Sequence, residues 1–279
     1  MGKYPVNLEL KDKAILLIGA GSVALRKFKR LAASGAVITV VSLYFSAEFR
    51  NYLIKELEKN KAVQQAAAVI NLCQQNDKFK QDSLKLEFKL AEQSCKILLV
   101  KRAFKADDLT GKFLVFAATA DSELNYQVFK LAHQNDILVN IADAKYSNYS
   151  DFTLPALIQQ GDLQLTAATG ANLPALAKNI KQQLADQFGF EYQLLLAVMA
   201  EIRPLALKKL KSAERQQFFR TIAAADFLNN LAELGRNLSK VELQQQLNQI
   251  SQGNKNSWLY QTARQKIIKL LASYQKKAR

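Results

Sequence analysis

The sequence predicts an α/β protein in which a doubly wound parallel sheet is followed by a small α/β domain and a helical C-terminal domain. Two observations predict the first part. Apolar runs alternate with helical segments up to residue 141, and a glycine turn follows the first run. Further along, two short alternating segments and then a long helical stretch replace this pattern. The 279 residues therefore divide into domains 1–152, 153–188 and 189–279.

The first unit is a strand, a turn, a helix and a second strand within about 30 residues, which is the length of a βαβ unit. Residues 14–18 are apolar throughout, as in a strand buried on both faces. Residues 22–34 predict a helix with apolar residues inward and with Lys27, like its basic neighbours, in solvent; Gly35 ends it. Residues 37–41 are mostly β-branched and predict the second strand.

Three more strands and a helix complete the predicted first domain. The strands are residues 97–100, 113–117 and 137–141, and the helix is residues 123–135. Between about 55 and 95 the chain is longer than a crossover requires, so we interpret this region as an insertion. Within it, residues 83–90 alternate with period two as in a strand, although their composition also allows a helix.

The turn after the first strand has the pattern G-x-G-x-x-A, from Gly19 to Ala24. Gly19 permits the tight turn, Gly21 lets a pyrophosphate approach the backbone, and the small Ala24 lets the helix pack closely. The N–H groups at the start of the helix then bind phosphate. Between a strand and a helix, this pattern predicts a Rossmann-type dinucleotide site, with a purely structural turn as the alternative.

The end of the second predicted strand usually identifies the dinucleotide. An acidic residue there binds the adenine ribose of NAD, and a nearby arginine accommodates the 2′-phosphate of NADP. Here the residues are Ser42, Leu43 and Tyr44, so neither an acidic residue nor an arginine is present. The motif alone leaves NAD and NADP open.

The carboxyl ends of two later strands carry further candidates. Ala118 and Thr119 follow the fourth strand, where the backbone lies beside the cofactor in doubly wound folds. Asp121 either belongs to that site or caps the next helix. Asp143 ends the fifth strand, where a carboxylate acts as a general base or simply stabilises a turn. His133, late in a predicted helix, is interpreted as a surface or packing residue.

The net charge of +15 is large for this chain, and seven Lys or Arg but no Asp or Glu occur in residues 251–279. Nucleic acid, an anionic membrane surface, a polyanionic small molecule or a merely solvated basic surface would each explain it. No nucleic-acid-binding motif is present, so we expect neither a nucleic-acid nor a membrane partner.

Several classes of protein are not indicated. No apolar stretch approaches the roughly 20 residues that span a bilayer, and the N-terminus lacks the apolar core of a signal peptide. Cys73 and Cys95 form neither a disulfide scaffold nor a zinc motif, so no metal site is expected. Together these observations predict a cytoplasmic protein.

Several motifs, in the right order, resemble those of the siroheme synthase family. They are residues 4–8 (YPVNL), 18–27 (IGAGSVALRK), 116–121 (FAATAD), 124–125 (LN), 139–143 (VNIAD), 152–156 (FTLPA) and 168–177 (ATGANLPALA). Three features depart from the family pattern. Ser22 replaces an acidic residue, Ala171 replaces a glycine, and the region around residues 55–95 is longer than usual.

The resemblance implies oxidation of precorrin-2 to sirohydrochlorin with NAD as hydride acceptor, and in some members insertion of ferrous iron to give siroheme. It also implies a homodimer formed through the short middle domain. The family's catalytic aspartate matches Asp143. Its NAD contacts match Ser22, Val23, Leu43 and Tyr44, and a serine that is phosphorylated in some members matches Thr169.

Precorrin-2 carries eight carboxylates, which suits a cationic protein. The predicted helix start near Gly170 and Asn172, with Asn172 as its N-cap, offers N–H groups to a carboxylate. We therefore expect Asn140, Thr169, Gly170 and Asn172 to bind the substrate. The alternative function is a module that senses NAD or a tetrapyrrole without turnover.

Overall fold

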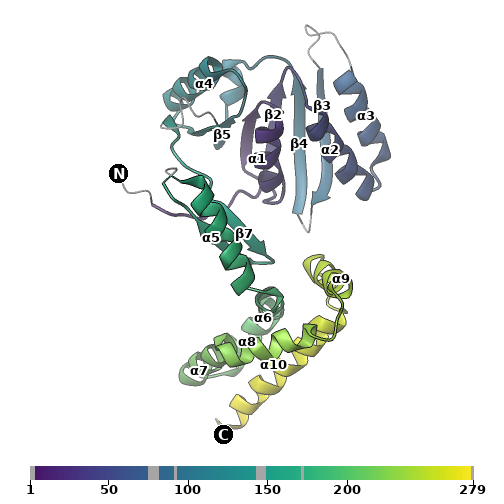
Figure 1. Cartoon of the computed structure of the whole chain (residues 1–279), viewed down its shortest axis with the longest axis vertical. Coiled ribbons are helices and arrows are strands. Elements are labelled where there is room, and N and C mark those ends of the chain that lie inside the picture. The colour runs from purple at the N-terminus through teal and green to yellow at the C-terminus, as the bar shows by residue number, and fades with distance from the viewer. Residues whose placement is uncertain (1–3, 75–81, 91–92, 143–148, 171–172, 278–279) are drawn as a thin grey trace. The chain divides into compact units, whose positions relative to one another are not determined.

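The computed structural model describes residues 4–74, 82–90, 93–142, 149–170 and 173–277. The chain forms two compact units, residues 1–153 and residues 154–279 (Figure 1). The division of the second unit at residue 188 stays a prediction. Among the described residues, no helix combines the length and the apolar character needed to cross a membrane.

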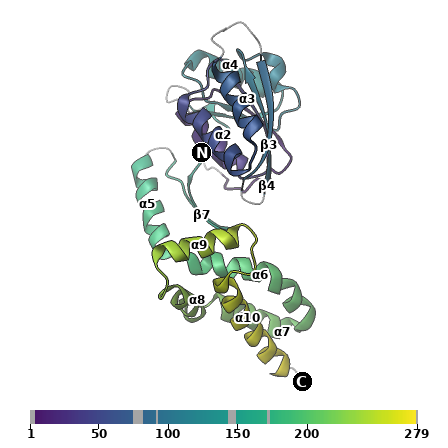
Figure 2. The same ribbon diagram turned by 90° about the vertical axis from the view of Figure 1, so that its right-hand side faces the viewer.

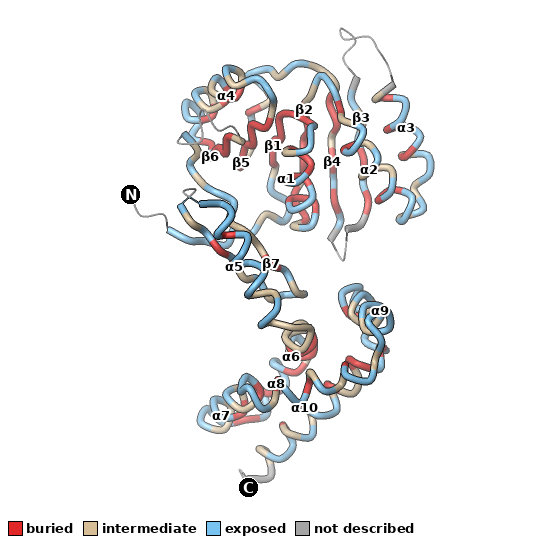
Figure 3. The backbone as a smooth tube through the Cα atoms, viewed as in Figure 1, coloured by how far each residue is buried: buried red, intermediate tan, exposed pale blue. Residues whose placement is uncertain are grey.

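The first unit is built on a six-stranded sheet with the order β3-β4-β2-β1-β5-β6 (Figure 1). The strands are β1 (Ala14–Ile18), β2 (Val37–Ser42), β3 (Asp82–Leu90), β4 (Gln93–Lys101), β5 (Leu114–Ala117) and β6 (Leu138–Ile141). All neighbouring pairs are parallel except β3 and β4, which are antiparallel. Figure 3 shows buried residues running along the central strands β1, β2 and β5, as their continuous apolar runs require.

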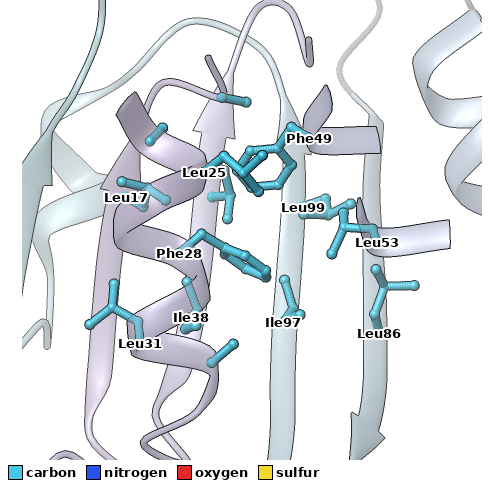
Figure 4. Close-up of a cluster of buried hydrophobic side chains, with 14 of the residues drawn as sticks. Leu17, Leu25, Phe28, Leu31, Ile38, Phe49, Leu53, Leu86, Ile97 and Leu99 are labelled. Atoms are coloured by element: carbon cyan, nitrogen blue, oxygen red, sulfur yellow. The ribbon is translucent and has the colours of Figure 1, made fainter. Parts of the chain in front are cut away.

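Helices cover both faces of this sheet, which confirms the predicted doubly wound fold. They are α1 (Ser22–Ala32), α2 (Ala47–Lys59), α3 (Val63–Gln74), the short 3-10 helix η1 (Ala106–Leu109) and α4 (Ser122–Gln134). One core layer joins α1, α2 and α3 to the sheet, with Phe28 and Phe49 at its centre (Figure 4). The layer on the other face contains Leu109 from η1 and Val128 from α4.

The region predicted to be an insertion, about residues 55–95, contains α3 and β3, and β3 is an edge strand of the sheet. Residues 83–90 are a strand and not a helix, because β3 pairs along its whole length with β4. Leu86 and Phe88 point into the core layer under the helices, while Lys85 and Glu87 are exposed. The period-two pattern of this segment therefore marks one buried face and one solvated face.

The chain reverses its direction of winding between β4 and β5. From β1 it proceeds outward through β2 to the edge strand β3, turns back into β4, and then crosses through η1 to β5 on the other side of β1. The carboxyl ends of β1 and β5 therefore flank the switch point, where doubly wound folds bind their ligands.

The second unit consists of a β-hairpin and a set of helices. Its elements are β7 (Ala156–Gln160), β8 (Leu163–Ala167), α5 (Pro174–Gln187), α6 (Phe190–Lys209), α7 (Ser212–Ala223), α8 (Ala225–Ala232), η3 (Glu233–Gly235), α9 (Lys240–Ser251) and α10 (Trp258–Lys277). Figure 2 shows α6 to α10 gathered in one bundle around a shared apolar core. The predicted hairpin and the predicted helical C-terminal region are both confirmed.

A small polar cluster connects α6 to α10 at the edge of that core. The Glu201 carboxylate accepts hydrogen bonds from Arg264 Nε at 2.7 Å and from Tyr260 Oη at 3.0 Å, and Lys255 Nζ lies 3.3 Å away. The hydrogen bond from Arg264 holds the pKa of Glu201 below its ordinary value. Such a carboxylate stabilises the fold above its unfolded-state pKa, and the contribution disappears as the pH falls through the folded-state pKa.

We therefore expect Glu201→Gln to lower the free energy of unfolding at pH 7 by about 1–2 kcal/mol. Thermal melts of the variant and the unsubstituted protein should converge as the pH falls through the lowered folded-state pKa of Glu201. The matched control is Glu233→Gln, because Glu233 pairs with Arg236 on the exposed surface. Equal melting temperatures for Glu201→Gln and the unsubstituted protein at pH 7 would contradict this role.

Candidate functional site

The turn after β1 fits tightly against the turn after β5. Gly19 has φ +100°, which a residue with a side chain rarely adopts, and its N–H donates to the Val41 carbonyl at 2.9 Å. A Cβ at this position would overlap the Ala118 carbonyl oxygen and lie 2.8 Å from the Ala118 carbonyl carbon. Only glycine is compatible with both the backbone conformation and the packing.

The second glycine of the motif lies in open space. Gly21 is the N-cap of α1 with φ −85°, and a Cβ built on it meets nothing within 4 Å. Ser22 is exposed, Val23 is half-buried, and the first turn of α1 carries no acidic residue. A phosphate can therefore approach the amino end of α1 without repulsion from a carboxylate in the first turn of the helix.

The loop after β2 lies next to this turn and presents two large side chains to solvent. Leu43 is 56% and Tyr44 68% exposed, whereas Phe45 is buried against Phe49. The loop is held by two hydrogen bonds, from the Ser46 N–H to the Ala20 carbonyl and from Ser42 Oγ to the Tyr44 carbonyl. Leu43 and Tyr44 are thus placed beside the glycine turn, as expected for residues that flank the adenosine half of a dinucleotide.

The turn after β5 is organised by a buried asparagine that sequence reasoning did not assign to the site. Asn125 is fully buried, and its Oδ1 accepts hydrogen bonds from the Thr119 N–H at 3.2 Å and Thr119 Oγ1 at 2.8 Å. Its Nδ2 donates to the Thr119 carbonyl. Asp121 caps α4 through the N–H groups of Glu123 and Leu124, which confirms the capping alternative. The only sequence signal for Asn125 was its place in one of the resembling motifs.

A hydrogen bond at β6 shows that the predicted position of Lys27 in solvent is wrong. Lys27 was expected in solvent, but its Nζ donates to Asn140 Oδ1 at 2.5 Å and lies 5.3 Å from the centre of the Phe116 ring. Asn140 is 6% exposed and also donates from Nδ2 to the Phe152 carbonyl. Because both sides of this amide are engaged, any part that Asn140 plays in substrate binding is expected to be indirect.

The remaining predicted residues lie elsewhere. Asp143, the predicted catalytic residue, and Asn172 lie outside the described residues. In the second unit, Thr169 Oγ1 donates to the Leu173 carbonyl at 3.1 Å, and Gly170 is exposed with φ +62°. Leu173, and not Asn172, occupies the N-cap position of α5.

Neither the histidine nor a cluster of metal ligands belongs to the site among the described residues. His133 is a surface residue, as expected; it contacts the Phe129 ring and pairs with Asp151. Among the described residues, no group of three His, Cys, Asp or Glu side chains could hold a metal ion.

The structure brings the turns after β1, β2 and β5 together at the switch point of the sheet. A dinucleotide fits these residues, because Gly19 closes the turn, Gly21 leaves space for a pyrophosphate, and the amino end of α1 supplies free N–H donors. The position of this site could be predicted from the sequence because the glycine pattern and the ends of the strands were enough to locate it. No long-range side-chain contact was needed for that prediction.

Comparison with known proteins agrees with this geometry. A family model described as "Putative NAD(P)-binding" matches residues 6–156. The siroheme synthase of Psychromonas ingrahamii is 26% identical over 244 residues, and that of Neisseria meningitidis serogroup C is 26% identical over 248 residues. These matches cover 87% and 88% of this chain but only 43% and 42% of those proteins, so the chain spans less than half the length of these relatives.

A solved structure titled "SirC, precorrin-2 dehydrogenase" has a similar fold. It aligns with a TM-score of 0.57 at 24% identity, and the match covers 89% of this chain and 98% of that one. The resemblance that the sequence motifs indicated is thus confirmed over most of the chain, and the Rossmann-like architecture with it.

Proposed function

This chain belongs to the NAD(P)-binding family matched over residues 6–156, and from that premise we propose that it catalyses the NAD-dependent dehydrogenation of precorrin-2 to sirohydrochlorin. The observation that carries the proposal is the glycine turn at the switch point, where Gly19 packs on Ala118 and Gly21 leaves the amino end of α1 open. The similarity to siroheme synthases and to a precorrin-2 dehydrogenase supports this choice of substrate.

The reaction removes one hydride and one proton from the macrocycle. NAD, when bound, supplies the hydride acceptor. The residues that would hold it are Gly19, Gly21, Ser22 and Val23 at the pyrophosphate, Leu43 and Tyr44 beside the adenosine, and Ala118 and Thr119 at the end of β5. We assign the proton to Asp143, which follows β6 in sequence and would act as the general base.

The substrate's carboxylates suit the charge of the protein. A net charge of +15 would steer a polyanion toward the chain at low ionic strength. In the second unit, Thr169 and the exposed Gly170 lie just before α5, together with Asn172 in sequence, and we propose these three as contacts for a substrate carboxylate. Ferrous iron would be a second substrate if the protein also makes siroheme, and the macrocycle nitrogens would be its main ligands.

The test is anaerobic turnover with the full chain. Precorrin-2 is generated in situ and mixed with the protein and with NAD or NADP, while NADH or NADPH and the tetrapyrrole spectrum are followed. Reduced dinucleotide appearing together with sirohydrochlorin would support the dehydrogenase, and adding ferrous iron to the same cuvette would test chelation. Dinucleotide binding without any turnover would overturn the proposal in favour of a sensor of NAD or a tetrapyrrole.

We further propose that the protein is a homodimer assembled through its second unit. Figure 3 shows α5 exposed along most of its length, and Ala177 is its only buried residue. Leu173 and Leu176 are 54% and 44% exposed, and the neighbouring sheet has only two strands. A two-stranded sheet with one poorly covered helix is marginal alone, so a second copy would supply the missing contacts.

Light scattering should then give a mass of twice 31.3 kDa. Leu176→Glu should shift the protein toward the monomer, because a buried charge at a contact is costly. The matched control is Val241→Glu on α9, where Val241 is 67% exposed. A monomeric mass for the unsubstituted protein at micromolar concentration would contradict the dimer.

A further inference from the structure

Lys27 lies in the second turn of α1 and is half-buried, whereas its neighbours Arg26, Lys29 and Arg30 are exposed. It stands three residues after Ala24 and four before Leu31, both of which are buried against the sheet. That spacing places it on the inner stripe of the helix, where an apolar side chain is the rule. The structure therefore holds a cation at a position that would ordinarily belong to the core.

Lys27 contacts β5 and β6 directly, and Asn140 connects it to the segment before residue 153. Its Nζ donates to Asn140 Oδ1 on β6 at 2.5 Å and lies over the Phe116 ring of β5. Asn140 Nδ2 donates to the Phe152 carbonyl at 2.8 Å, and the Phe152 ring meets the Phe116 ring edge-on at 5.5 Å. These four residues form a closed set, which we call the Lys27 clamp.

The residues just before Phe152 are also hydrogen-bonded to β6. The Ile141 N–H donates to Ser150 Oγ at 2.9 Å, and the Val139 N–H donates to the Asp151 carboxylate at 2.8 Å. The Asp151 N–H donates back to the Val139 carbonyl. The outer edge of β6 is thus held by residues 150 and 151 and not by a further strand, and Lys27 connects β6 to α1.

No carboxylate among the described residues faces the Lys27 ammonium. The groups that contact it are the Phe116 ring of β5 and the Asn140 amide of β6, and neither is charged. Asp151 instead points to His133 of α4. Burial first, and then the charges of Arg26 and Arg30, lower the pKa of Lys27 to about 8. Since an apolar residue would avoid this cost, a lysine here indicates a role beyond stability.

We propose that the Lys27 ammonium is a positioning group for the reaction: it holds the carboxyl end of β6 against the helix whose amino end binds the dinucleotide. Lys27 touches neither cofactor nor substrate in this role, but it keeps the strand that leads to the reacting groups in register with the dinucleotide turn. This inference rests on the proposed function, because only that function places the chemistry at the end of β6.

The first test compares Lys27→Met with Lys29→Met. Lys29 is the matched control, since it lies on the same helix but is exposed, with its Nζ over the Tyr52 ring of α2. Lys27→Met should lower kcat about 10-fold, leave the Kd for NADH within about 3-fold, and leave the melting temperature unchanged or raised. Unchanged kcat, or a loss of kcat that follows a fall in melting temperature, would overturn the proposal.

The second test uses pH. In the unsubstituted protein kcat should decline as the pH rises through about 8, because the amine makes a weaker hydrogen bond to Asn140 and loses its attraction to the Phe116 ring. Lys27→Arg keeps the charge and should abolish the decline. Asn140→Asp places a carboxylate next to the Lys27 amine, which should raise the pKa of Lys27 and move the decline of kcat to higher pH. A decline that is the same in all three proteins would count against Lys27.

Unfolding does not explain such a decline. Because the folded-state pKa of Lys27 lies below the ordinary value of 10.5, its contribution to the free energy of unfolding increases between pH 8 and 10.5. An NMR titration of the Lys27 side chain, with amide exchange at Val139 and Ile141, measures the clamp without any turnover. Absence of turnover in the unsubstituted protein and in every variant would refute the proposed function but not the clamp. A Lys27 side chain that titrates near its ordinary pKa of 10.5 would refute the clamp.

Discussion

Gly19→Ala should abolish measurable binding of NADH and destabilise the first unit. The added Cβ would overlap the Ala118 carbonyl, and alanine disfavours the φ of +100° at this position. Strain and displacement of the turn after β5 together should cost about 2–4 kcal/mol of the free energy of unfolding. The affinity for NADH, followed by its fluorescence, should fall at least about 100-fold, because both turns of the site move.

Gly21→Ala is the matched control, since it adds the same methyl group two residues away. Its backbone conformation suits any residue and its Cβ meets open space, so the melting temperature should change little. The methyl group would nevertheless occupy the space left for a pyrophosphate, and NADH affinity should fall about 10-fold or more. If Gly21→Ala binds NADH as well as the unsubstituted protein, the phosphates do not approach the chain at this turn.

Asp143→Asn should lower dehydrogenase turnover by about 100-fold or more while leaving the Kd for NADH unchanged. The expectation rests on the place of Asp143 at the end of the fifth predicted strand and on the motif that contains it. Replacing the carboxylate by an amide removes the proton acceptor but keeps the shape of the side chain. Single-turnover measurements with precorrin-2 and NAD would separate the chemical step from binding.

A carboxylate at the opposite end of the same strand provides the control. Asp136 is exposed just before β6 and has φ +54°, which asparagine also adopts readily, so Asp136→Asn should leave turnover and stability unchanged. Full turnover by Asp143→Asn would remove the general-base role from Asp143. The dehydrogenase assignment itself would then depend on the glycine turn and on the turnover assay.

The fold could be predicted well from the sequence because its main signals are local. A continuous apolar run marks a strand buried on both faces, and the glycine pattern marks the turn that follows it. β1 was predicted with its observed limits, Ala14–Ile18. The strand–helix ambiguity at residues 83–90 could not be resolved in this way, since the deciding fact is the pairing of β3 with β4.

The parts of the site that the sequence did not reveal depend on partners far along the chain. Lys27 is charged and lies between charged residues, so local reasoning places it in solvent. Its burial follows from Asn140, more than a hundred residues later. Asn125 lies in a helix of ordinary amphipathic pattern, and its function is visible only from the Thr119 backbone groups that it satisfies.

The contact between Gly19 and Ala118 also links cofactor affinity to folding. The two residues are about a hundred positions apart, so the unfolded chain does not contain the paired turns, and a dinucleotide would bind only after β5 has docked beside β1. By mass action, dinucleotide at about 100 times its Kd would add about 2.7 kcal/mol to the stability of the first unit. The cellular supply of cofactor would then set the lifetime of the folded protein as well as its rate of turnover.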